Sequence, residues 1–108
     1  MPDLNKFWEE LKNGITSLAE NGFKDFKDQA IAAGNDFIEQ SKEDLKLWTE
    51  QLAAGQINQK DFEWNVKSKE TTLKLILQKQ KGLAKAQVDK LTSGLLDLIM
   101  STAFKSLL

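Results

Sequence analysis

The segment LAAGQIN, residues 52–58, divides the sequence into two helical halves. Gly55 suits the left-handed backbone conformation that often follows the last residue of a helix. Asn58, with Asp61 three residues later, is typical of an N-cap residue whose acidic partner reaches back to the cap. We therefore predict that the main turn of the chain lies near residues 53–58 and joins two helices.

Apolar residues in the first half recur every eleven residues, a period that spans three helical turns at about 3.67 residues per turn. A loop would normally reset this phase, yet it continues through Gly22 and Gly34, each of which weakens a helix by about 1 kcal/mol. The pattern predicts one long helix from about residue 3 to 53, with kinks near residues 22 and 34. The residues at this period are Leu4, Ile15, Phe26, Phe37 and Trp48.

The second half also follows a helical period, with a kink or very short turn predicted at Gly82. Its last segment, residues 91–108, is apolar or small around roughly two thirds of a helical wheel. The polar sector of this wheel is narrow. A helix of this kind needs neighbours on several sides, and one hairpin supplies too few of them.

The sequence thus predicts an all-α fold without strands, formed by residues 1–108 as a single domain. We expect a long helical hairpin of two to four segments, which completes a four-helix bundle by self-association, with a dimer favoured. The interface would use the apolar side of the last helix. The alternative is a four-helix bundle formed by one chain, with true loops at Gly34 and Gly82. The interface candidates are Leu95, Leu98, Ile99, Phe104 and Leu107.

Three tryptophans are the largest apolar side chains of the sequence. Trp48 and Trp64 stand near the main turn, so we expect them to close that end of the bundle. Trp8 lies on the apolar face of the first half. Core packing is the favoured role for all three, and a partner interface is the alternative, because indole rings suit both settings.

The composition argues against enzymatic chemistry. The chain contains neither Cys nor His, which removes thiolate and imidazole catalysis and the usual transition-metal ligands. No phosphate-binding glycine motif is present. The acidic pairs Asp25/Asp28, Asp36/Glu39 and Glu39/Glu43 fall in one sector of the first helix, where we interpret them as a solvated face. We expect no catalytic residue, no cofactor and no bound metal.

Charge is distributed unevenly. Residues 1–54 contain six Lys and eleven acidic residues, whereas residues 55–108 contain nine Lys and five acidic residues. On one continuous second helix, five lysines would form a basic stripe that could face anionic lipid or nucleic acid. The absence of Arg and of interleaved aromatic residues argues against nucleic acid. The stripe comprises Lys60, Lys67, Lys74, Lys81 and Lys85.

These observations predict a non-enzymatic, self-associating helical scaffold or adaptor that buries an amphipathic face against itself or a partner protein. The alternative is a peripheral protein that coats a lipid or granule surface with an opened amphipathic hairpin. The first residues show no secretory signal pattern, so a cytoplasmic location is expected.

Overall fold

The computed structural model describes residues 4–108, so the predicted helix start near residue 3 lies outside the described part. Within this range the chain is all-helical and contains no strand, as the sequence predicted. The five α-helices and one short 3₁₀ helix, η1, follow in the order α1 (Leu4–Gly22), η1 (Lys24–Phe26), α2 (Lys27–Ala53), α3 (Gln59–Lys67), α4 (Glu70–Gln78) and α5 (Lys85–Leu107).

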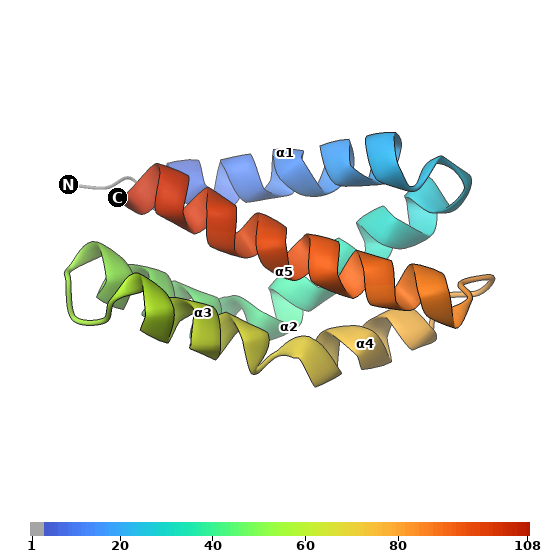
Figure 1. The fold of residues 1–108 in the computed structure, drawn as a ribbon. Coiled ribbons are helices and arrows are strands. Elements are labelled where there is room, and N and C mark those ends of the chain that lie inside the picture. The colour runs from blue at the N-terminus through green and yellow to red at the C-terminus, as the bar shows by residue number, and fades with distance from the viewer. Residues whose placement is uncertain (1–3) are drawn as a thin grey trace.

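The helices form an up-and-down bundle in which α3 and α4 together take the third position (Figure 1). Each position runs antiparallel to the one before it, and α5 returns beside α1. The start of α1 and the end of α5 therefore lie at the same end of an elongated molecule that measures 41 × 23 × 19 Å. Both α5 and α2 contact every other α-helix.

The turn between α2 and α3 lies where the sequence predicted it. Gly55 has a φ of +75°, in the left-handed region. The Asn58 side chain accepts a hydrogen bond of 2.8 Å from the Asp61 N–H, and the Asp61 carboxylate accepts one of 3.3 Å from the Asn58 N–H. This capping box satisfies two N–H groups at the start of α3.

The predicted continuous helix over residues 3–53 is wrong, because the chain reverses direction at residues 23–26. Gly34, where a kink or a loop was expected, lies buried within α2, and the helix continues through it. A Cβ atom at this position would lie 2.8 Å from Ile15 Cγ2 on α1. The glycine therefore allows α1 and α2 to approach closely, which a pattern of helix-breaking residues does not reveal.

The second half is also more divided than predicted. A break at Ser68 and Lys69 separates α3 from α4, and the Lys69 ammonium group forms an ion pair with Asp44 on α2. The same ammonium group lies 5.8 Å from the centre of the Trp48 ring. Gly82 has a φ of +86° in a full loop between α4 and α5, so this position is a true turn and not a kink.

One chain thus supplies all four positions of the bundle, as the alternative interpretation of the sequence expected. Besides the main turn, the chain reverses at residues 23–26 and 79–84. Phe7, Phe37 and Phe62 are fully buried in the common core. Trp8 and Trp48 are half-buried at its edge. Trp64 does not close the bundle, because 77% of its surface is exposed.

The close approach at Gly34 gives a stability prediction. Gly34→Ala should lower the free energy of unfolding by up to about 2 kcal/mol, because overpacking against Ile15 costs about 1–3 kcal/mol and the gain in helix propensity is only about 1 kcal/mol. Urea denaturation of the purified protein measures this difference. Gly22→Ala is the matched control, since a Cβ at Gly22 has no neighbour within 4 Å. Equal stability of the two variants would contradict the packing role of Gly34.

Candidate functional site: the groove between α1 and α2

The predicted interface residues of α5 lie against other helices of the same chain. Leu95, Ile99 and Leu107 belong to the buried core. Leu98 is half-buried against α1, where a Cβ on Gly14 would lie 2.7 Å from its Cδ1 atom. Phe104 is half-buried too, with its ring 5.8 Å from the ring of Phe62 on α3.

A second copy is therefore not needed to cover α5. The sequence argument assumed a hairpin in which α1 and α2 formed one long helix, and such a hairpin has too few layers. The turn at residues 23–26 brings α1 back onto α5 and supplies the missing layer. A partner surface made by Leu95 and Ile99 would require the bundle to open.

The predicted basic stripe is also distributed differently. Lys60 and Lys67 lie on α3, whereas Lys74 lies on α4. Lys81 lies in the loop that contains Gly82, and Lys85 begins α5. The single helix that this prediction assumed is interrupted at residues 68–69 and 79–84.

Lys74 is engaged in ion pairs. Its ammonium group lies 3.0 Å from the carboxylate of Glu70 and 3.8 Å from that of Asp89. The hydrogen bond and the charge of Glu70 raise the pKa of Lys74, with a smaller contribution from Asp89. This lysine therefore stays charged at neutral pH and acts within the chain, as a bridge between α4 and α5.

The acidic pairs lie on the surface of η1 and α2, and every one of these carboxylates is exposed. Among residues 4–108 no group of three or more acidic side chains is placed to hold a metal ion. Within the same range, no helix combines the length and the apolar character needed to cross a membrane.

A large concave feature of the described surface lies between α1 and α2. The two helices are close near the 23–26 turn and diverge toward the other end of the bundle (Figure 1). The resulting groove has a volume of about 650 Å³, within the range of ligand-binding clefts. Its apolar floor is formed by Trp8, Leu11, Ile15 and Ile38. Trp8 and Ile38 are only half-buried, so apolar surface remains accessible inside the groove.

The rim of the groove is polar and mainly basic. Lys12 lies on the α1 side, and Lys42 and Lys46 lie on the α2 side. Glu39 is the acidic residue among the lining residues. All four side chains are exposed, so the charges are available to a molecule that enters the groove. Asn5 and Asn35 add amide groups at the edge.

Sequence reasoning did not find this site. In a continuous helix, Trp8 and Ile38 would lie about 45 Å apart at 1.5 Å per residue. Only the unpredicted turn at residues 23–26 brings them to the same groove. The sequence shows only that Trp8 and Ile38 are apolar residues of a helical segment. It does not show which other segment each of them faces.

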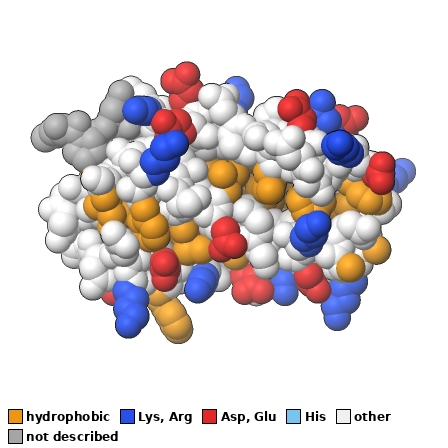
Figure 2. Space-filling model, turned by 45° about the horizontal axis from the view of Figure 1, so that its top comes forward, with side chains coloured by type: hydrophobic (Ala, Val, Ile, Leu, Met, Phe, Trp, Pro, Cys, Tyr) orange, Lys and Arg blue, Asp and Glu red, His pale blue; other side chains and the backbone are white. Residues whose placement is uncertain are grey.

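The rest of the visible surface offers less. On the face shown in Figure 2, hydrophobic side chains form narrow strips bordered by charged residues, and no broad apolar patch is seen. Among residues 4–108, four large apolar side chains are exposed by half or more, and single apolar residues of this kind are normal on protein surfaces. They are Leu47, Trp64, Leu75 and Leu108.

Comparisons with known proteins do not assign this fold or this groove. No protein-family model matches the chain, and neither the curated proteins nor the solved structures give a significant match.

A substitution at Leu95 tests whether this residue belongs to the core of one chain or to an interface between chains. Leu95→Ala should lower the free energy of unfolding by about 2–5 kcal/mol, because it leaves a cavity inside one chain. Thermal or urea unfolding at several protein concentrations measures the effect, which should not depend on concentration. Leu75→Ala, at a leucine that is 55% exposed, is the control and should change stability by less than about 0.5 kcal/mol. A loss of stability that depends on protein concentration would instead indicate that Leu95 lies in an interface between two chains.

Proposed function

We propose that this protein is a non-enzymatic helical adaptor that binds an acidic, amphipathic helix of a partner protein in the groove between α1 and α2. The observation that carries this proposal is the divergence of the two helices over an apolar floor with a lysine-rich rim. Recognition of an amphipathic helix in a hydrophobic groove is a common mode of peptide binding.

The dimensions of the groove support a helical ligand. Its lining residues extend from Asn5 to Ile15 on α1 and from Asn35 to Lys46 on α2. At 1.5 Å per residue, each side is about 15 Å long, which corresponds to about three turns of a bound helix. A segment with apolar residues at positions i, i+3, i+4 and i+7 would present its apolar side to Trp8 and Ile38.

The charges support an acidic ligand. Three lysines and one glutamate line the groove, so a helix with Asp or Glu along both edges would find complementary charges. Exposed ion pairs contribute mainly to specificity and association rate, and burial of the indole ring of Trp8 would supply most of the affinity.

The alternative proposal is that the protein coats an anionic lipid or granule surface. This mode would use the apolar face of α5, which the other helices cover in the closed bundle. It would therefore require opening of the core, whereas the groove is accessible without any rearrangement. We favour the adaptor for this reason.

A designed peptide pair tests the proposal. Two amphipathic helices with the same apolar residues, one flanked by Glu and one by Lys, are titrated into the protein and followed by NMR chemical shifts. The Glu-flanked peptide should bind more tightly, and its shifts should include the indole N–H of Trp8 and the amides around Ile38. Vesicles with and without anionic phospholipid form the third arm.

The variant Lys42→Glu/Lys46→Glu should weaken binding of the Glu-flanked peptide by at least about tenfold and reverse the peptide preference, because it inverts two charges of the rim. Lys60→Glu/Lys67→Glu on α3 is the matched control and should leave binding unchanged. Equal binding of both peptides, or shifts confined to other helices, would refute the groove. Binding to anionic vesicles without peptide binding would favour the lipid alternative.

A further inference from the structure

We propose that two copies of this protein exchange α1, and that the turn between α1 and α2 straightens into continuous helix when they do so. In the exchanged dimer, α1 of each copy would occupy the position that α1 of the other copy holds in the monomer. The inference rests on the local structure of residues 22–27 and not on the predicted α5 interface.

The turn between α1 and α2 follows the helix-weakening pair Asn21-Gly22, but it has neither a side-chain cap nor a residue of positive φ. Phe23 and Phe26 hold the N-cap positions of η1 and α2, and neither provides a side-chain cap. By contrast, the turn after α2 has a left-handed glycine, Gly55, and a capping box at Asn58. The backbone groups at the α1–α2 junction would gain partners in a continuous helix.

Few backbone angles separate the turn from a helix. Phe23 has φ −141° and ψ 50°, and Phe26 has φ −127° and ψ 28°. Between them, η1 is already helical, and Lys27 has φ −52° and ψ −50°. None of these residues has a positive φ, so each can adopt helical angles without crossing from positive to negative φ.

The apolar pattern passes through the turn without a change of phase. Ala19, Phe23, Phe26, Ala30 and Ala33 follow one another at spacings of four, three, four and three residues. All except the half-buried Phe26 belong to the buried core. In a straight helix these residues would share one face, so the core-facing sides of α1 and α2 would remain aligned.

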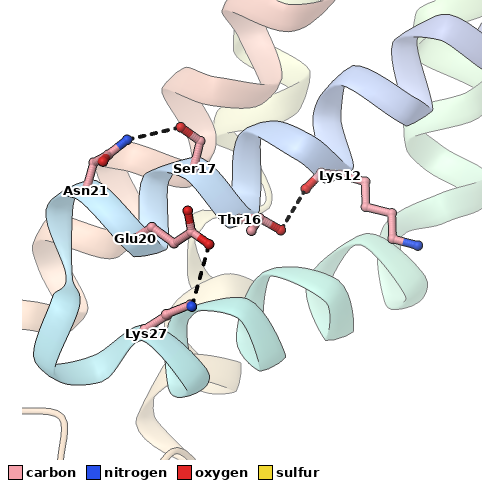
Figure 3. A network of polar contacts seen from close by, with 6 residues as sticks. All are labelled: Lys12, Thr16, Ser17, Glu20, Asn21 and Lys27. Carbon is pink, nitrogen blue, oxygen red and sulfur yellow. Dashed lines mark hydrogen bonds and ion pairs between the residues drawn. The ribbon is translucent and has the colours of Figure 1, made fainter.

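The contacts that close the turn are weak. The Lys27 ammonium group lies 3.5 Å from the Glu20 carboxylate, and about half of each side chain is exposed (Figure 3). An exposed ion pair of this kind contributes little. Figure 3 shows that the other polar contacts nearby, such as the 3.2 Å hydrogen bond from Asn21 to Ser17, lie within α1 and do not hold the turn closed.

The surface beside the turn is hollowed. A depression of about 270 Å³ lies between residues 22–26 and the start of α5, where Ala86, Gln87 and Lys90 complete its lining. The Phe23 ring is buried, and the Lys90 ammonium group lies 5.3 Å from its centre. Straightening would therefore disturb the packing of Phe23, whereas the interfaces of α1 with α2 and α5 would be formed again between copies.

The exchanged dimer would contain two antiparallel helices over residues 4–53, with the twofold axis at the former turns. Each groove would then combine Trp8 and Lys12 of one copy with Ile38, Lys42 and Lys46 of the other. If the proposed adaptor function holds, the dimer presents two composite grooves and can join two partner helices. The exchange itself does not depend on that function.

Molecular mass measured by light scattering across a concentration series tests the exchange, with two variants of the turn. Gly22→Ala should raise the dimerisation constant, by less than about thirtyfold, because Gly22 ends α1 in the monomer but would lie inside a continuous helix in both copies of the dimer. Lys24→Pro should lower it by more than about a hundredfold, because proline is tolerated at the first position of η1 but not inside a continuous helix. Circular dichroism confirms that both variants fold.

A disulfide reports which copy supplies α1. The natural chain has no cysteine, and Ile15 and Gly34 are in close contact, so Ile15→Cys/Gly34→Cys places one thiol pair between α1 and α2. After oxidation, the monomer fraction should give a single chain on a denaturing gel, and the dimer fraction should give two linked chains.

The expected result is a dimer that Gly22→Ala favours, that Lys24→Pro removes and that carries disulfides between chains. Monomers at every concentration in both the natural protein and Gly22→Ala would overturn the exchange. So would a dimer that Lys24→Pro leaves intact, or one with disulfides only within chains. These measurements use no peptide, so failure of the exchange is distinct from failure of the adaptor proposal.

Discussion

The apolar surface of α5 has to be covered on several sides, and the remaining helices are arranged around this requirement. Residues 91–108 have few polar positions, and α1, α2, α3 and α4 all contact α5. A chain that kept residues 4–53 as one helix would leave part of this surface in water. Because burial of apolar area is the main favourable term in folding, the reversal at residues 23–26 is stabilised by the contacts it permits more than by its own sequence.

This origin explains which parts of the fold could be predicted. The turn at residues 54–58 has its determinants in the local sequence, Gly55 and Asn58, and both act within a few residues. The helical state of nearly every segment follows from periodicity in the same way. The reversal at Phe23 has a weaker local determinant, Gly22, which predicted only a kink because the apolar phase continues through it. Gly34 looked like a break because sequence alone does not show that Ile15 packs against it.

The same limit applies to the candidate site. The five residues predicted as an interface point to several sides of α5, and other helices of the same chain bury or partly bury all of them. The lysines predicted as a stripe were assigned to one helix that is in fact interrupted at Ser68 and Gly82. The groove combines Trp8 and Ile38 from two helices that pack together only after the reversal. A site formed by tertiary structure has no signature in either helix alone.

The reversal and the groove both follow from the packing of α1, which contacts α2 near the turn and α5 along its length. Close approach at Gly34 and Ile15 fixes α1 to α2 near the turn, while α5 needs the outer part of α1 as cover. At its end away from the 23–26 turn, α2 lies beside α3, and there it diverges from α1. The groove is the space left by this divergence, and Trp8 at its floor is half-buried for that reason. Any occupant that covers Trp8 would complete a layer that the chain itself leaves open.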